Sequence, residues 1–300
     1  MIKKIGLVFL AFFSIAVLYS FSSVKAPVQK PALRTIIVDA GHGGEIPGAR
    51  GAYSNEKDIC LAVALKLGKK LEKEFPETKI LYTRTTDVFP PNKSRADFAN
   101  ANKGDLFISI HANAGPKLKH SKFNGYKTET YYKGTGKKRK KYTRKVPKYQ
   151  VYFTDNPSRG TETYIWAADR SDEKEQFIAN DVVSEQVYDS TEFVPDINDP
   201  EFKAKALLWT KRFFDKSYLL ASLVEEAFVQ QGRFSRGVKQ RNEKGIWVLQ
   251  ATSMPSILVE LGFVTYREDE DYLNSEKGQE EMSDNILEAV KRYRAATESK

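Results

Sequence analysis

The stretch TIIVDAGHGG, from Thr35 to Gly44, constrains the fold more than any other part of the sequence. Its β-branched apolar run, Ile36 to Val38, predicts a strand that is buried on both faces. The strand ends in a turn of small residues that carries His42, and the glycines of this turn let a ligand approach the main chain. Because ligands bind beyond the carboxyl ends of the strands in open α/β sheets, the turn is a candidate site.

Strands and helices are predicted to alternate after this turn. Apolar residues at helical spacing predict helices over 56–75, from Asn92 onward, over about 200–214, and over 217–230 and 279–293. Short apolar runs predict strands over 79–83, 105–111, 161–166, 246–249 and 256–261. Such alternation is typical of an α/β fold with a mostly parallel sheet, and 300 residues are ample for its core.

The N-terminus has the pattern of an export signal. Lys3 and Lys4 precede an apolar run from Ile5 to about Phe21, and small residues then lead to Ala26. This order predicts a signal peptide over 1–26, with an uncleaved membrane anchor as the alternative. We therefore expect an exported protein of the periplasm or cell envelope, with no membrane span once the signal is removed.

The segment at 116–158 differs in charge from the rest of the chain. Between Lys117 and Lys148, thirteen lysines and arginines stand against one acid, Glu129, for a net charge of +12. The whole chain carries +9, so the remainder is mildly acidic at −3. Glycines and tyrosines here predict an extended or hairpin insertion. It is either a solvated, mobile loop or a clamp on an anionic polymer. Nucleic acid would fit the charge equally well, but it is not an expected partner of an exported chain.

Two of the three histidines, His42 and His111, occupy equivalent places at the carboxyl ends of predicted strands. Glu56 opens the helix after the His42 turn, where the helix dipole stabilises a carboxylate. Each residue taken singly also fits a core histidine or a capping acid. Together, two imidazoles and a carboxylate are the ligand set of a catalytic zinc site with an open position for water. The same set also suits a non-haem iron enzyme.

A fourth candidate, Glu260, lies inside the apolar run from Ser256 to Phe263. A carboxylate buried in such a strand is costly unless a cation or hydrogen bonds compensate it. A metal ion would supply that compensation, and a glutamate beside it can take the proton of a water molecule as general base. The alternative, a carboxylate pointing outward at the strand end, is disfavoured by the apolar neighbours.

An ordered series of short motifs gives the chain a resemblance to a known family. The matching segments are VDAGHGG at 38–44, NEKD at 55–58, TRTTD at 83–87, the stretch from SR to AN at 94–102, SIHAN at 109–113, GTETY at 160–164 and PSILVELGFVT at 255–265. In order and spacing they resemble the zinc-dependent N-acetylmuramoyl-L-alanine amidases. These are cell-wall hydrolases that cut the amide between N-acetylmuramic acid and the stem peptide.

The resemblance implies a role for each candidate residue. The family's metal ligands fall on His42, Glu56 and His111, with Zn²⁺ as the cofactor. Its catalytic glutamate falls on Glu260. Peptidoglycan is then the substrate, and wall remodelling or daughter-cell separation is the implied cellular role. A clamp formed by the 116–158 segment would then hold an anionic polymer such as peptidoglycan carboxylates, with its tyrosines stacking on sugars.

The resemblance also implies an architecture, a twisted, mixed, mostly parallel sheet flanked by helices. We expect one catalytic domain over 33–295, with a basic insertion at about 116–158 and an acidic and helical insertion at about 169–214. The second insertion resembles in position a helical segment that blocks the site in some division amidases, where a partner protein displaces it. Glu185 or Glu192 would be the masking carboxylate, and an activator protein would act on this segment. An extra packed helix pair is the plainer interpretation.

Two other functions stay open at this point. The chain fits an exported wall-binding protein that kept an amidase-like fold, although that function needs a broken ligand set and none of the four positions is missing. It also fits a different metal-dependent peptidase or a non-haem iron enzyme, which analysis of the bound metal would distinguish from a zinc amidase.

Overall fold

Six strands form one mixed sheet in the computed structural model, which describes residues 33–179 and 199–298. The strand order is β2 (Lys79–Tyr82), β1 (Thr35–Ala40), β3 (Leu106–Asn113), β8 (Ser256–Phe263), β6 (Thr161–Ile165) and β7 (Ser235–Gln240). Neighbouring strands are parallel except β6 and β8, which are antiparallel. The predicted α/β fold with a mixed, mostly parallel sheet is confirmed. The predicted signal peptide at 1–26, Glu185 and Glu192 lie outside the described residues.

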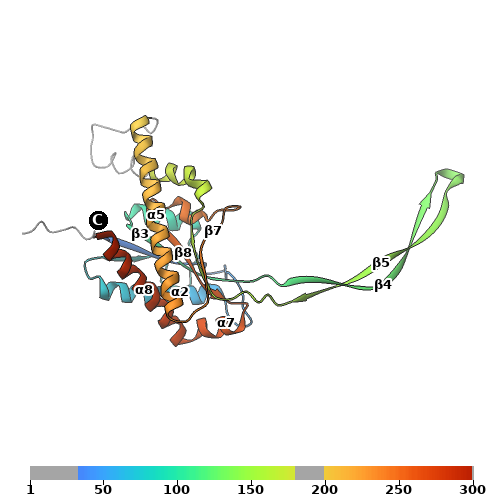
Figure 1. Cartoon of the computed structure of the whole chain (residues 1–300), viewed down its shortest axis with the longest axis horizontal. Coiled ribbons are helices and arrows are strands. Elements are labelled where there is room, and N and C mark those ends of the chain that lie inside the picture. The colour runs from blue at the N-terminus through green and yellow to red at the C-terminus, as the bar shows by residue number, and fades with distance from the viewer. Residues whose placement is uncertain (1–32, 180–198, 299–300) are drawn as a thin grey trace, which may run out of the picture. The chain divides into compact units, whose positions relative to one another are not determined.

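Helices cover both faces of the sheet (Figure 1). One face carries α2 (Glu56–Glu74), α5 (Pro200–Gln230) and α8 (Glu276–Glu298), and the other carries α3 (Asn92–Ala101) and α6 (Trp247–Ala251). A further helix, α7 (Arg267–Asn274), joins β8 to α8. All six residues of β1 are buried, as the apolar run predicts. Among the described helices, none has the long apolar stretch that crossing a membrane requires.

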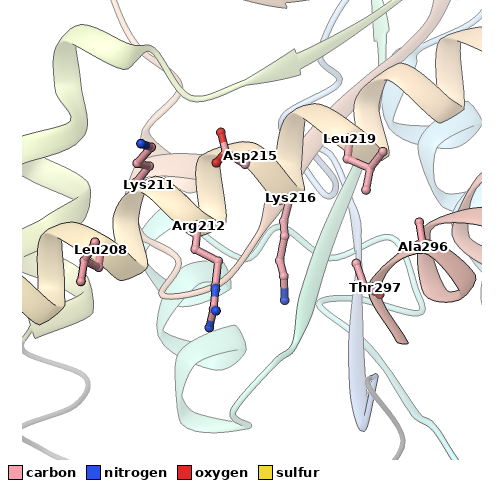
Figure 2. Close-up of a pocket in the computed structure, with 8 residues that line it drawn as sticks. All are labelled: Leu208, Lys211, Arg212, Asp215, Lys216, Leu219, Ala296 and Thr297. Atoms are coloured by element: carbon pink, nitrogen blue, oxygen red, sulfur yellow. The ribbon is translucent and has the colours of Figure 1, made fainter. Parts of the chain in front are cut away.

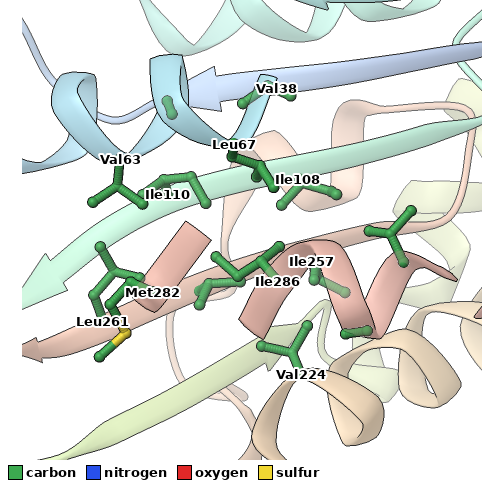
Figure 3. Close-up of a cluster of buried hydrophobic side chains, with 14 of the residues drawn as sticks. Val38, Val63, Leu67, Ile108, Ile110, Val224, Ile257, Leu261, Met282 and Ile286 are labelled. Carbon is green, nitrogen blue, oxygen red and sulfur yellow. The ribbon is translucent and has the colours of Figure 1, made fainter. Parts of the chain in front are cut away.

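The larger hydrophobic core lies between the sheet and α2, α5 and α8 (Figure 3). Val38, Ile108 and Ile257 enter it from three neighbouring strands, and Val224 and Ile286 enter it from the helices. Burying a side chain of this size contributes about 1.5–3 kcal/mol. This layer therefore fixes the relative positions of β1, β3 and β8, the strands nearest the candidate residues.

Several predicted elements differ from the observed ones. The helices predicted at 200–214 and 217–230 are one continuous helix, α5. Ser217 lies inside this helix, and its buried hydroxyl accepts a hydrogen bond from the Ser256 amide at 2.9 Å. The strand predicted at 246–249 is wrong, since these residues begin α6. A short apolar run cannot be distinguished from a buried helical turn by its periodicity. Neither β7 nor α7 was predicted.

The basic segment forms a long two-stranded hairpin, which confirms the extended or hairpin prediction (Figure 1). Strand β4 (Leu118–Lys133) pairs antiparallel with β5 (Lys140–Thr154), and a short 3₁₀ turn, η1 (Gly136–Lys138), joins them. We call Leu118–Thr154 the basic hairpin. Its two strands pack mainly on each other, and within the described residues no helix or strand of the six-stranded sheet packs extensively against them.

Candidate metal centre and active site

His42 stands in a tight turn just beyond the carboxyl end of β1. Its φ of 57° lies in the left-handed region, which residues other than glycine seldom adopt. Gly44 follows with a φ of 53°, and its amide donates to Asp87 Oδ1 at 2.8 Å. The backbone of the turn therefore requires the glycine-rich sequence. The change of direction at this turn places the His42 side chain in the lining of a cavity.

Two buried arginines hold the carbonyl groups of this turn. Arg95 donates to the carbonyl oxygens of Ala40 and His42 at 2.6 and 2.7 Å. Arg84 donates to those of Ala40 and Gly41 at 2.9 and 2.7 Å. Three successive backbone positions before and at the histidine are thus fixed by charge-assisted hydrogen bonds, which are stronger than neutral ones.

The structure also identifies the acid that compensates this buried charge. Asp87 and Asp97 are the acids nearest to the two arginines in the sequence, but no described ion pair joins either acid to either arginine. Those acids form ion pairs with lysines, Lys57–Asp87 and Lys93–Asp97. Arg95 instead pairs with Asp39 at 2.6 Å, and both side chains are almost completely buried.

The three predicted metal ligands meet beside the turn. His42 Nε2 lies 3.1 Å and His111 Nδ1 lies 2.7 Å from the same atom, Glu56 Oε1. One ligand atom from each residue lies within 4.8 Å of the other two. The topology explains this convergence, because β1 and β3 are parallel neighbours and α2 begins at Glu56. Residues 42, 56 and 111 are therefore a candidate metal cluster.

Glu56 is held in its charged form. Burial by itself would raise its pKa, but hydrogen bonds to His111 and His42 outweigh this effect and hold the pKa well below its ordinary value. The amides of Ala49 and Ala112 also donate to its two oxygens, at 2.7 and 3.1 Å. A fixed and ionised carboxylate is ready to bind a cation.

Two glycines leave the space that this cluster occupies. A Cβ atom on Gly41 would lie within 2.4–2.8 Å of three atoms of the His111 ring. A Cβ on Gly48 would lie 2.5 Å from Glu56 Oε2 and 2.6 Å from His42 Cδ2. All of these distances are far shorter than van der Waals contact. Any side chain at position 41 or 48 would therefore displace His42, Glu56 or His111.

Glu260 lies at the same end of the sheet. The parallel register of β3 and β8 sets His111 opposite Glu260, so the two side chains leave the sheet on the same face. Together with His42 and Glu56 they line a cavity of about 330 Å³. Glu260 Oε2 is buried and finds no hydrogen-bond partner among the described residues. Burial, and then the negative charges of Glu56 and Glu162, raise the pKa of Glu260 well above its ordinary value.

Two charged neighbours of Glu260 were missed by the sequence reasoning. Glu162 on β6 is the antiparallel register partner of Glu260, and its side chain binds Arg236 Nε at 2.7 Å. Arg241 lines the cavity and opposes the rise in the pKa of Glu260. Glu162 carried the same signal as Glu260, an acid within a predicted strand. Arg241 carried none, because it follows the unpredicted strand β7.

The donor set of the cavity fits a divalent cation. Its lining includes two imidazoles and two carboxylates, Glu56 and Glu260, against one arginine, Arg241. Two histidines and one carboxylate, with room beside them for a water molecule, are the ligands of catalytic zinc sites. The orphaned oxygen of Glu260 points to a missing polar partner in the same place.

A larger cavity lies between α5 and the C-terminal part of α8 (Figure 2). Its volume is about 670 Å³, and its lining residues are Leu208, Lys211, Arg212, Asp215, Lys216, Leu219, Ala296 and Thr297. It shares no lining residue with the cavity at Glu260 and contains no histidine. The four candidate site residues therefore lie at the smaller cavity and not at this one.

The described part of the 169–214 segment packs on the body of the protein. A helix at 171–179 buries Lys174, which donates to the carbonyl oxygens of Leu249 and Met254 at 2.7 and 3.1 Å. No described residue of this segment lines the cavity at Glu260. This agrees with extra packed helices, while the proposed masking residues fall outside the described part of the chain.

Comparison with known proteins identifies the family. A family model described as N-acetylmuramoyl-L-alanine amidase matches residues 36–292. The chain belongs to this family. The match spans the sheet, the three residues of the metal cluster and Glu260, so the residues that carried the resemblance all lie inside it.

Two relatives each match most of the chain. The N-acetylmuramoyl-L-alanine amidase AmiC of Escherichia coli is 31% identical over 270 residues, which are 90% of this chain and 54% of that protein. The protein YqiI of Bacillus subtilis is 29% identical over 87% of this chain and 84% of its own length. The chain thus spans about half the length of AmiC, which contains sequence that this chain does not match.

Solved structures support the amidase fold. An N-acetylmuramoyl-L-alanine amidase from Clostridium difficile 630 superposes with a TM-score of 0.56 at 24% identity and covers 87% of this chain and 97% of that one. AmiC2 of Nostoc punctiforme superposes with a TM-score of 0.54 at 23% identity, covering 87% of this chain and 97% of that one. At these identities the likeness establishes the fold.

Proposed function

We propose that this amidase is a zinc-dependent hydrolase that cuts the amide bond between N-acetylmuramic acid and L-alanine in peptidoglycan. The observation that carries the proposal is the convergence of His42, Glu56 and His111 within 4.8 Å, beside the buried and unpartnered Glu260 Oε2. Membership of the family and the relationship to AmiC support the choice of substrate.

In this proposal His42, Glu56 and His111 hold the metal ion. Zinc bound there would polarise the lactyl carbonyl and lower the pKa of a water molecule. Gly41 and Gly48 leave room for the ligands, and the backbone amides of Ala49 and Ala112 keep the Glu56 carboxylate in place.

Glu260 is the proposed general base. Its free Oε2 accepts a proton from the attacking water while the water oxygen bonds to the carbonyl carbon. Glu260 then returns the proton to the alanine nitrogen as the carbon–nitrogen bond breaks. The products are a free carboxyl group on the lactyl ether and a stem peptide with a free amino terminus. Glu260 has this free acceptor oxygen, whereas both oxygens of Glu56 are already engaged, by His111 and the amides of Ala49 and Ala112. This favours Glu260 over Glu56 as the base.

The proposed setting is the cell wall of the periplasm or cell envelope, where the enzyme would remodel peptidoglycan or separate daughter cells. The signal pattern at 1–26 and the cell-wall relatives support export. An activator acting on the 169–214 segment remains a proposal. One structural neighbour, the CwlD amidase of Clostridioides difficile, is described in complex with the GerS lipoprotein.

Digestion of purified sacculi, followed by mass analysis of the products, tests the reaction. We expect free stem peptides that begin with L-alanine, and we expect none from a Glu260→Gln variant that retains its metal. Muropeptides released with the amide intact would overturn the proposal.

Metal analysis of the purified chain tests the cofactor separately. We expect one equivalent of zinc in the native chain and a large loss in a His111→Ala variant. Stoichiometric iron would instead favour the non-haem iron enzyme, which uses the same ligand types. Hydrolytic activity that survives complete removal of the metal would also contradict the assignment.

A further inference from the structure

The basic hairpin presents an exposed surface that the proposed reaction does not use. It carries most of the cations of a segment with a net charge of +12, and its side chains are exposed over nearly its whole length. Isolated two-stranded hairpins are marginally stable in water, so this ribbon contributes little to the stability of the fold. Its exposed length and its concentrated positive charge are typical of a surface that binds an anionic partner.

The strand register divides the hairpin into two different faces. Directly paired residues of an antiparallel ladder share a face, and alternate positions lie on opposite faces. Phe123 pairs with Tyr149, and Tyr126 pairs with Pro147, so a bulge of one extra residue in β4 keeps both pairs on one face. The rings of Phe123 and Tyr126 lie 5.2 Å apart, which confirms that they are neighbours on that face.

One of these faces carries a continuous row of apolar side chains. The row, which we call the aromatic stripe, consists of Phe123, Tyr126, Pro147, Tyr149, Val151 and Phe153. All six are exposed, with Tyr126 at 65% and Phe153 at 58%. Contiguous exposed apolar surface of this kind marks an interaction site in a soluble protein.

The tyrosines of the opposite face already have partners. Tyr131 and Tyr142 stack on each other with ring centroids 5.6 Å apart, and Arg144 lies over Tyr131 at 5.6 Å. Tyr152 stacks on His120 at 5.1 Å. The rings of the aromatic stripe also contact each other, but Phe123 meets Tyr126 and Tyr149 edge to face and not in a parallel stack. The stripe therefore leaves more ring surface exposed to a ligand than the stacked pairs of the opposite face.

The hairpin is joined to the rim of the active-site cavity. It leaves the sheet directly after β3, the strand that carries His111, and Ala114 lines the cavity. The Gly115 amide donates to Thr265 Oγ1 at 2.9 Å, and Asn156 Nδ2 donates to the Pro116 carbonyl at 3.1 Å. The first bond ties the start of the hairpin to the body, and the second ties its two ends to each other. The aromatic stripe lies in the half of the hairpin nearer these ends.

We propose that the aromatic stripe is a binding surface for the glycan strand of peptidoglycan, an inference that rests on the proposed function. The apolar faces of sugar rings would stack on Phe123, Tyr126 and Tyr149. Lys119 and Lys145 lie on the same face as the stripe and would pair with carboxylates of the stem peptides. The amide under attack lies in the cavity while the polymer continues along the hairpin.

The distribution of residues disfavours a lipid surface as the occupant. Residues 133–141, around the end of the hairpin, contain lysine, arginine, glycine and threonine but no apolar side chain. A hairpin that inserted into a bilayer would carry apolar residues at its end, because they enter the hydrocarbon first. Here the apolar residues of the stripe lie in the other half, toward the ends of the hairpin that join the body.

Binding of sacculi to the full chain, in a Glu260→Gln background that prevents digestion, tests this inference. The test variant is Phe123→Ala/Tyr149→Ala, and the matched control is Tyr131→Ala/Tyr142→Ala. Each removes one directly paired aromatic couple without changing the charge. We expect the dissociation constant for sacculi to rise about tenfold or more in the test variant, since two stacking rings are lost. We expect a change of less than about twofold in the control, and rescue of binding by Phe123→Trp/Tyr149→Trp.

Three results would overturn the inference. Unchanged binding by the test variant excludes the stripe, and an equal loss in both variants shows that only the intact ribbon or its charge matters. Loss of binding to phosphatidylglycerol vesicles without loss of binding to sacculi would assign the stripe to a membrane. Thermal unfolding of each variant shows whether the body is intact.

The outcome is separable from that of the proposed reaction. Digestion of sacculi by the native chain reports the reaction, whereas binding in the Glu260→Gln background reports the stripe. Binding through the stripe without release of stem peptides would refute the reaction and leave this inference standing.

Discussion

The carboxyl edge of the sheet and the basic hairpin use charge in opposite ways. At the sheet edge, charged groups such as Asp39, Arg95 and Glu56 are buried, and each is fixed by short hydrogen bonds. On the hairpin, charges such as Arg144 and Glu129 are exposed to solvent. Breaking a buried ion pair costs far more than breaking an exposed one. The buried charges of the sheet edge therefore stabilise the fold and hold the proposed catalytic residues in place. The exposed charges of the hairpin contribute little to stability and are available to bind a ligand, as proposed.

The same substitution, glutamate to glutamine, tests the two regions most strongly when it is made once in each, at Glu260 and at Glu129. We expect Glu260→Gln to lower kcat on a soluble muramoyl peptide by about 10²–10⁴-fold, because general-base catalysis contributes that much. Glu129→Gln, in the hairpin, should leave kcat within about twofold, because its pair with Arg144 is screened by solvent and lies outside the cavity. Metal content should be equal in both. A Glu260→Gln variant with nearly native kcat would remove Glu260 from the reaction.

Two arginines provide the next comparison. Arg95→Met leaves Asp39 buried without its partner and should lower the free energy of unfolding by about 3–5 kcal/mol. Arg144→Met breaks a solvent-screened pair with Glu129 and should change the free energy of unfolding far less than Arg95→Met does. Urea denaturation of the two variants measures both values. Equal losses would contradict the division between the two regions.

The pH dependence of stability sharpens the same contrast. Burial opposes ionisation of Asp39, but the charge of Arg95 and the hydroxyls of Ser109 and Thr83 outweigh it and lower the pKa of Asp39 below its ordinary value of 3.8. A carboxyl group whose pKa is lower in the folded state stabilises the fold above its unfolded pKa, and this contribution is lost as the pH falls through the folded value. We therefore expect the native chain to lose stability as acid is added below about pH 4, and Asp39→Asn to lose less of it. Parallel unfolding curves for both chains across this range would show that Asp39 is not the group responsible.

The smallest effect is expected from removal of the hairpin. Replacing residues 118–154 by a short glycine and serine linker should change the free energy of unfolding of the body by less than about 1 kcal/mol, because no element of the sheet packs extensively on the hairpin within the described residues. Thermal unfolding measures this. A loss of several kcal/mol would show that the hairpin belongs to the stable core.

The sequence by itself determined the local features of this protein. The β-branched run at Ile36, the glycines around His42 and the apolar face of the helix from Glu56 each depend on residues within one element. The glycines and tyrosines of the basic segment likewise predicted its hairpin. Motif order predicted the family, which the family model then established. These signals are readable because backbone preference and hydrophobic periodicity act over a few residues.

The pairing of buried charged side chains, in contrast, is visible only in the tertiary structure. Arg95 binds Asp39, 56 positions away, although Asp97 is much nearer in the sequence. Arg241 reaches the cavity from a loop that no local pattern marked. The register between β3 and β8 set Glu260 opposite His111, and an antiparallel strand added Glu162. Burial makes such pairings strong, and burial depends on how distant elements pack. For that reason the partners of buried charges cannot be predicted from sequence neighbours.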